Sequence, residues 1–182
     1  KEVKANTVTQ SLIIEEDLQA FIEETSLNQK PYEGLLKKYK GDKKALLQEL
    51  MTLISERIAS SRNMALFINA NKSITLQGIK LYLFYPSDSV IHGNVLFEEN
   101  IFSVVQELPY KFNHQGAQIF SFRPDLVTFV NGIYLGYSEL KSNYTSQSAS
   151  KNGRGKVLKD YFEAVKVYHQ HIDSNAMLSD KE

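Results

Sequence analysis

Apolar residues recur at helical spacing in two stretches near the start of the chain. In residues 12–24 they fall near one face, with acids between them, which predicts an amphipathic helix. Residues 44–60 repeat this pattern more strongly, and the predicted apolar stripe consists of Leu46, Leu47, Leu50, Leu53, Ile54 and Ile58. Between the two helices, Pro31 and Gly34 are expected to interrupt regular structure.

The middle of the chain changes to patterns that favour strands. Residues 79–85 are rich in β-branched and aromatic side chains and end at Pro86, and a second strand is predicted over residues 101–108. Two further strands, residues 125–130 and 133–141, are joined by Asn131-Gly132, a strong hairpin signal. A polar loop is then predicted over residues 142–153, and an apolar stripe predicts a last helix over residues 155–172.

This order of helices, strands and a final helix predicts an α/β fold with a mixed central sheet flanked by helices. The length of 182 residues and the hydrophobic content of 42% suit a single well-buried domain. We expect residues 1–75 to form an N-terminal helical extension that packs on a core made by residues 76–182.

Composition narrows the candidate functions. The 21 basic and 21 acidic residues cancel, so any contact with a polyanion must be local. Residues 1–27 have an acidic excess, whereas residues 141–171 have a basic one. There are no cysteines, which excludes disulfides, thiolate zinc sites and a cysteine nucleophile. Without an apolar run of about 18 residues or a signal-like start, a soluble cytoplasmic protein is expected, and the initial Lys1 suggests a piece of a longer chain.

Three charged residues stand out around the predicted hairpin. Asp125 begins its first strand, and Glu139 and Lys141 lie near the end of its second strand. Charged groups placed among apolar strands must be paired, hydrogen-bonded or bound to a metal ion. Glu139 and Lys141 are two residues apart in a strand, so their side chains share one face of the sheet.

The position of Asp125 depends on the register of the hairpin. A plain two-residue turn at Asn131-Gly132 would place Asp125 opposite Ser138 and turn Glu139 to the other face. One extra residue, in a three-residue loop or in a bulge near Gly136, would place Asp125 opposite Glu139. We predict this extra residue.

Two carboxylates on neighbouring strands match the preference of Mg²⁺ for oxygen ligands. Asp125 and Glu139 would hold the ion, and Lys141 would lie near the metal-bound water and a scissile phosphate. The alternative is that Asp125 caps a turn while Glu139 and Lys141 form an ordinary surface ion pair on an edge strand. The apolar character of both strands and the preceding Arg123-Pro124 favour the metal site.

These residues also resemble a known family. Arg123-Pro124-Asp125, the run Val-x-Phe-Val-Asn-Gly-Ile-x-Leu from residue 127 to residue 135, and Glu139-Leu140-Lys141-Ser142 resemble the amino-terminal nuclease domain of the restriction (R) subunit of type I restriction–modification enzymes. That domain is a member of the PD-(D/E)xK nuclease superfamily. The resemblance is strongest over about residues 94 to 141.

The resemblance implies a restriction-endonuclease-like core and a Mg²⁺-dependent endonuclease acting on double-stranded DNA. It assigns the metal to Asp125 and Glu139 and makes Lys141 the catalytic lysine. It also implies that a longer chain carries an ATP-driven motor and assembles with specificity and methyltransferase subunits. This sequence has no G-x-x-x-x-G-K-[ST] loop, since Gly153-Arg154-Gly155-Lys156 lacks that spacing, so ATP binding is not expected.

One element of the family pattern is missing. Many members carry Gln-x-x-x-Tyr on the helix after the lysine, and no such string follows Lys141 here. Tyr161 alone, or Arg154 and Lys156 as phosphate-binding residues, are the candidates for its role, and all three are predicted to make weak DNA contacts. The acid that the superfamily carries on its first core helix would correspond to Glu49 or Glu56, although a solvent-facing role for either is the simpler explanation.

Other chemistry fits the sequence less well. His92, His114, His169 and His171 lack metal-ligand spacing, and Ser138 and Ser142 have no histidine partner for nucleophilic catalysis. Two alternatives to the restriction enzyme stay open: another PD-(D/E)xK nuclease that acts in repair or junction resolution, and an inactive nuclease fold that serves in docking or DNA binding.

Overall fold

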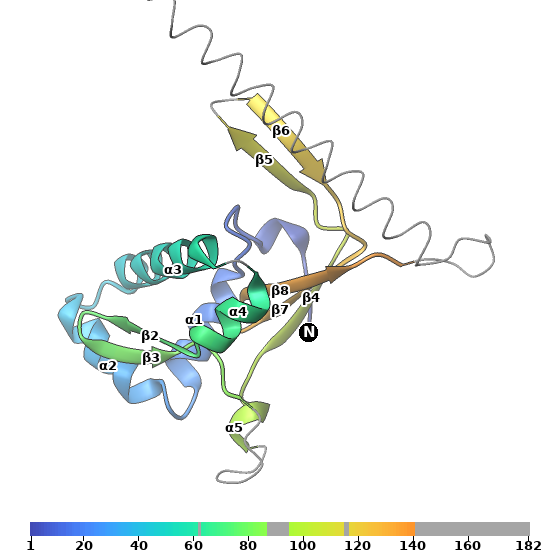
Figure 1. Cartoon of the computed structure of the whole chain (residues 1–182). Coiled ribbons are helices and arrows are strands. Elements are labelled where there is room, and N and C mark those ends of the chain that lie inside the picture. Colours follow the sequence, from blue (N-terminus) through green and yellow to red (C-terminus); the bar gives the residue numbers. More distant parts are fainter. Residues whose placement is uncertain (62, 87–94, 115–116, 141–182) are drawn as a thin grey trace, which may run out of the picture. The chain divides into compact units, whose positions relative to one another are not determined.

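The structure is a computed structural model that describes residues 1–61, 63–86, 95–114 and 117–140. It has a mixed α/β architecture, as predicted (Figure 1). The helical elements are the 3-10 turn η1 (Ala5–Thr7), α1 (Glu15–Glu24), α2 (Gln29–Lys38), α3 (Lys43–Ser60), α4 (Met64–Ala70) and α5 (Val95–Glu98). The strands are β1 (Glu2–Val3), β2 (Ser73–Leu76), β3 (Ile79–Tyr82), β4 (Phe102–Gln106), β5 (Tyr110–His114), β6 (Ala117–Phe122), β7 (Leu126–Val130) and β8 (Ile133–Ser138).

A four-stranded mixed sheet has the order β1-β4-β7-β8. β1 pairs in parallel with β4, matching Val3 with Val105. β4 and β7 run in opposite directions, as two hydrogen bonds at their ends show: Asn131 N donates to Ile101 O, and Glu107 N donates to Asp125 O. Two antiparallel hairpins, β2–β3 and β5–β6, complete the strands, and β5–β6 contains an irregularity between Phe112 and Asn113.

The helices α1 and α3 confirm the two amphipathic patterns. α3 begins at Asp42, whose carboxylate accepts a hydrogen bond from Ala45 N, and it buries Leu46, Leu50 and Ile54. The expected interruption between them is wrong, because Pro31 and Gly34 both lie inside α2. Pro31 is in the first turn, where its missing N–H costs the helix little.

The predicted strands exist, but most are shorter than expected. Residues 83–85 lie beyond the end of β3, although all three are buried. The short strand β1, the helices α4 and α5, and the strands β2, β5 and β6 were not predicted. The predicted loop over residues 142–153 and the predicted helix over residues 155–172 lie outside the described residues.

The hydrophobic core is built by helices α1 to α4, the β2–β3 hairpin and the turn end of the β7–β8 hairpin. Its fully buried side chains include Phe21, Leu35, Leu50 and Phe67. Figure 1 shows the helices grouped around the β2–β3 hairpin. Gly34 of α2 allows a close approach to that hairpin, since a Cβ there would lie 3.2 Å from Ile79 Cδ1.

The described residues fall into two compact units. The helical unit comprises Lys1–Gln106 and Val127–Gly136, and the hairpin unit comprises Glu107–Leu126 together with residues from 137 onward. The division of the chain between residues 75 and 76 stays a prediction.

Candidate functional site

The two predicted acids lie at the ends of the strands that the Asn131-Gly132 turn connects. Asp125 directly precedes β7, follows the buried Pro124 and is half-buried. Glu139 directly follows β8 and is also half-buried, with its Oε1 atom out of contact with solvent. Both acids belong to the hairpin unit.

The turn between β7 and β8 differs from the three-residue loop, which was one of the two predicted forms of the extra residue. Only Asn131 and Gly132 separate the strands, and both have positive φ angles, 51° and 76°, as in a type I′ turn. The rings of Phe129 and Tyr134, which are opposite each other in a two-residue hairpin, lie 6.3 Å apart. The three-residue loop, one of the two predicted forms of the extra residue, is therefore excluded, and the other form, a bulge near Gly136, stays a prediction.

The physical reason for the short turn is its packing. A Cβ on Gly132 would lie 2.3 Å from Ile14 O and 2.7 Å from Leu18 N, so only glycine fits there. The Asn131 side chain is fully buried, accepts a hydrogen bond from Ile101 N and donates to Leu83 O. Its short amide tolerates the left-handed conformation. These contacts favour asparagine and glycine at the two turn positions.

The structure nevertheless brings Asp125 to the Glu-Leu-Lys triplet. Asp125 Oδ2 accepts a hydrogen bond from Leu140 N at 2.5 Å. Because β8 ends at Ser138, Glu139 lies beyond the ladder, and strict alternation no longer fixes the face it occupies. The carboxylate of the first acid thus reaches the backbone amide of the residue directly after the second acid.

The structure describes some of the other residues singled out in the sequence and leaves others outside the described ranges. Lys141, Arg154, Lys156 and Tyr161 lie outside the described residues. The described histidine, His114, is in β5, and Ser138 is the last residue of β8. In the described ranges, no group of three or more histidines and acids is close enough to hold a metal ion.

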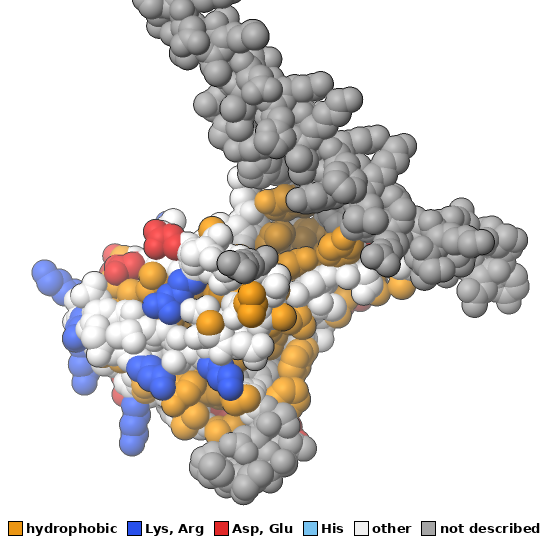
Figure 2. All heavy atoms as spheres, in the orientation of Figure 1, with side chains coloured by type: hydrophobic (Ala, Val, Ile, Leu, Met, Phe, Trp, Pro, Cys, Tyr) orange, Lys and Arg blue, Asp and Glu red, His pale blue; other side chains and the backbone are white. Residues whose placement is uncertain are grey.

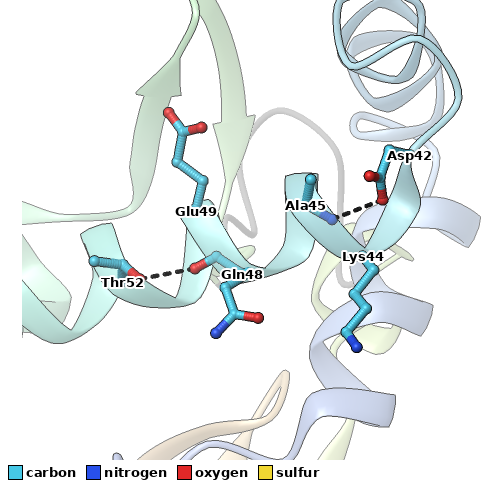
Figure 3. Close-up of a pocket in the computed structure, with 6 residues that line it drawn as sticks. All are labelled: Asp42, Lys44, Ala45, Gln48, Glu49 and Thr52. Carbon is cyan, nitrogen blue, oxygen red and sulfur yellow. Dashed lines mark hydrogen bonds between the residues drawn. The ribbon is translucent and has the colours of Figure 1, made fainter.

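The helical acid predicted from the superfamily pattern has other partners. Glu49 is exposed on α3, accepts a hydrogen bond from the Tyr39 hydroxyl at 2.6 Å and contacts Gln77 Nε2 at 3.4 Å. It lines a shallow hollow of about 530 Å³, in which it and Lys44 extend from different sides of the helix (Figure 3). Glu56 is exposed on the same helix. These contacts agree with a surface role for both residues.

The sequence analysis missed the contacts of Glu107, which lies near Asp125. Glu107 lies at the end of β4, its backbone N–H donates to Asp125 O, and its carboxylate pairs with Arg123. Both members of this pair are more than 60% exposed, so the pair contributes little to stability. No sequence signal indicates this contact, since it depends on the β4–β7 pairing.

Among the residues that the structure describes, the most buried acid is Asp17, which was also missed. It is 1% exposed, and its carboxylate binds Lys1 Nζ and Ser103 Oγ. This pairing joins α1 to Lys1, which directly precedes β1, and to Ser103 in β4. Its position within the apolar stripe of α1, next to Leu18, is the signal that could have identified it.

A second hollow, of about 300 Å³, is lined mostly by apolar side chains from the helical unit, among them Phe84, Phe97 and Phe102. Neither this hollow nor the one on α3 includes Asp125 or Glu139. A search of the described helices for a membrane span found none of sufficient length and apolarity.

These observations define a mixed α/β domain in which an aspartate reaches the backbone of a Glu-Leu-Lys triplet. The family model described as "Type I restriction enzyme R protein N terminus" matches residues 6–175. The chain belongs to this family, so it is an N-terminal domain of a type I restriction enzyme R subunit. Searches of the curated proteins and of the solved structures found no match.

Proposed function

We propose that this chain is the Mg²⁺-dependent endonuclease domain of the R subunit and that it hydrolyses phosphodiester bonds in double-stranded DNA. The observation that carries the proposal is the hydrogen bond between Leu140 N and Asp125 Oδ2. It brings the Asp125 carboxylate to the backbone of the residue after Glu139, which supports a site shared by the two acids. Membership of the R subunit family supports DNA as the substrate.

In this proposal each residue has a distinct role. The carboxylates of Asp125 and Glu139 hold the divalent ion, which is a hard cation that prefers such oxygen ligands. When bound, the ion polarises the phosphoryl group and lowers the pKa of a coordinated water. Lys141 orients the attacking water and offsets negative charge on the phosphate. Arg154, Lys156 and Tyr161 add weak contacts to DNA.

The proposal extends to the fold and the assembly. A restriction-endonuclease-like core would form around the sheet that carries Asp125 and Glu139, with the N-terminal helices as an extension. Through the rest of the R subunit, the domain would work with specificity and methyltransferase subunits, which recognise the target sequence. The sequence itself contains no phosphate-binding loop for ATP.

The test is Mg²⁺-dependent cleavage of supercoiled DNA by the complete restriction complex. Asp125→Asn, Glu139→Gln and Lys141→Ala are each expected to reduce cleavage by about 10²-fold or more, as removal of a group that stabilises the transition state does. Asn at position 125 can still accept the Leu140 hydrogen bond, so the loss would report the missing charge. Glu98→Gln, which changes an exposed acid on α5, is the matched control and should cleave normally.

Two results would contradict the proposal. Unchanged cleavage in the three variants would remove these residues from the chemistry. DNA binding by a complex that shows no metal-dependent cleavage, unchanged by Asp125→Asn, would instead favour an inactive docking or DNA-binding module. A titration with Mn²⁺ separates metal binding from cleavage. If Asp125→Asn and Glu139→Gln weaken Mn²⁺ binding, the two acids form a metal site whether or not the complex cleaves DNA.

A further inference from the structure

A dense group of lysines lies where α2 ends and α3 begins. Five lysines and a single acid, Asp42, occur in the eight residues 37–44. We call the five lysines the basic corner: Lys37, Lys38, Lys40, Lys43 and Lys44. All five are exposed and belong to the helical unit. The space-filling view shows basic side chains gathered at the end of the helical unit that carries the α2–α3 turn, and acidic ones over α3 (Figure 2).

Few of these charges are neutralised within the described residues. Lys43 pairs with Glu23 at 3.2 Å, and Lys38 Nζ donates to the neutral carbonyl of Gln77 at 2.6 Å. Lys37, Lys40 and Lys44 take part in none of the ion pairs found in the described ranges. The neighbouring Asp42 carboxylate already caps α3, and Glu49 is bound by the Tyr39 hydroxyl.

Helix stability does not explain the placement of Lys40, Lys43 and Lys44, whereas Lys37 and Lys38 lie in the last turn of α2, where positive charge is favourable. Lys43 and Lys44 lie in the first turn of α3, which contains no acid, although positive charge is unfavourable at this positive end of the helix dipole. Lys40 adopts a left-handed conformation with φ of 54°, which is unfavourable for a residue with a long side chain such as lysine. Gly41, which follows with φ of 84°, closes the turn by donating from its N–H to Leu36 O. Lys43 and Lys44 thus carry positive charge where the helix dipole opposes it, and Lys40 carries a long side chain where the backbone conformation is unfavourable.

We propose that the basic corner binds the phosphate backbone of duplex DNA through residues other than those of the candidate cleavage site. The inference rests on the proposed function, which supplies DNA as the partner. Lysines are compact charges on flexible stems that bind phosphate without geometric selectivity. The corner therefore contacts DNA without reading its sequence, which suits a subunit that leaves recognition to another.

Binding is tested in the complete R subunit without ATP or Mg²⁺, using a short fluorescent duplex that lacks a recognition site. K37Q/K40Q/K44Q should weaken binding about 10-fold or more and reduce the slope of log affinity against log salt by about 2 to 3, as loss of three phosphate contacts implies. The matched control is K4Q/K30Q/K72Q, which removes three exposed lysines of the helical unit outside the corner and should change both quantities far less.

A second measurement uses the unaltered chain and so does not depend on whether the variant folds. Acetylation of each lysine is followed by mass spectrometry in the complete restriction complex, with and without the same duplex. DNA should reduce the reactivity of Lys37, Lys40 and Lys44 and leave that of Lys4, Lys30 and Lys72 unchanged. Equal reactivity with and without DNA would overturn the inference, as would equal weakening by the two triple variants.

The other subunits alone could protect Lys37, Lys40 and Lys44 from acetylation, with no further change when DNA is added. That result would overturn the inference in favour of a protein partner. The test is separate from that of the proposed function, because binding is measured without the metal. If Asp125→Asn still cleaves while the lysine variant loses binding, the endonuclease assignment fails and the DNA-binding surface stands. The opposite pair of results would retain the endonuclease and remove the surface.

Discussion

The helical unit contains the buried hydrophobic core, whereas the hairpin unit contains the acids of the candidate site. Every side chain of the buried core cluster belongs to the helical unit, from Ile13 to Ile133. The described part of the hairpin unit instead carries Asp125, Glu139 and the exposed Arg123–Glu107 pair. Stability and candidate chemistry are therefore carried by different residues, so variants should separate the two properties.

The largest expected effect comes from the core. Phe21 is completely buried and its ring lies 5.0 Å from that of Tyr85, so Phe21→Ala should lower the free energy of unfolding by about 3–5 kcal/mol. Asp125→Asn should leave that free energy nearly unchanged while abolishing cleavage. Urea unfolding and the cleavage assay measure the two effects. A large loss of stability in Asp125→Asn would mean that the acid is structural.

The elements predicted correctly are those whose signal is local. α3 follows from a continuous apolar stripe, and the β7–β8 hairpin follows from Asn131-Gly132. The signal for β5 and β6 was also present, because aromatic residues alternate with polar ones from Tyr110 to Phe112 and from Phe120 to Phe122. That alternation was overlooked.

Other features could not be predicted because they depend on distant contacts. The two-residue strand β1 forms only by pairing with β4, about a hundred residues later. α2 was missed because Pro31 was interpreted without knowing that it lies in the first turn. At the candidate site, the sequence indicated Asp125 and Glu139, but the hydrogen bond from Leu140 N depends on the register, which is constrained by the packing of Gly132 on α1.

The next largest effect is expected from the packing of Gly132 on α1, which a comparison of two matched glycines tests. Gly132 and Gly78 both follow a residue of positive φ in a hairpin turn, and both have φ of 76°. A Cβ at Gly132 would meet Ile14 O at 2.3 Å, whereas nothing lies within 4 Å of a Cβ at Gly78. Gly78→Ala should cost about 1–2 kcal/mol from conformation alone. Gly132→Ala should cost at least about 1–2 kcal/mol more, in the range of overpacked sites.

Thermal and urea unfolding of the two alanine variants measure this difference. Equal costs would show that the hairpin turn can move away from α1 without loss. A larger cost for Gly132→Ala accompanied by reduced cleavage would further show that the helical unit constrains the register on which the candidate site depends.

A smaller effect is expected from the buried amide network. Asn100 Oδ1 accepts from Tyr85 N and Asn131 Nδ2, and its Nδ2 donates to Tyr85 O and Phe97 O. Asn100→Ala leaves these buried groups without their partner and should cost about 1–3 kcal/mol in urea unfolding. Asn69→Ala, at an exposed position of α4, should change the free energy by about 0.5 kcal/mol or less. Similar costs would mean that water replaces the amide.

The smallest expected effect depends on pH and contrasts one acid from each unit. Burial alone would raise the pKa of Glu23, but hydrogen bonds from Tyr32, Gln19 and Lys43 outweigh it and lower the pKa. A carboxyl whose pKa is lowered in the folded state stabilises the fold above its unfolded pKa, near 4.5. That contribution is lost as the pH falls through the folded value.

Tyr32→Phe removes the 2.6 Å hydrogen bond to Glu23, so it should reduce stability at pH 7 and have little effect at pH 3. The exposed Arg123–Glu107 pair in the hairpin unit is the comparison, and Arg123→Gln should leave stability nearly unchanged at both pH values. Urea unfolding of both variants at the two pH values provides the measurement. If Arg123→Gln showed the stronger pH dependence, charged pairs in the hairpin unit would contribute to stability. The contrast between a stabilising helical unit and a hairpin unit that contributes little to stability would then be wrong.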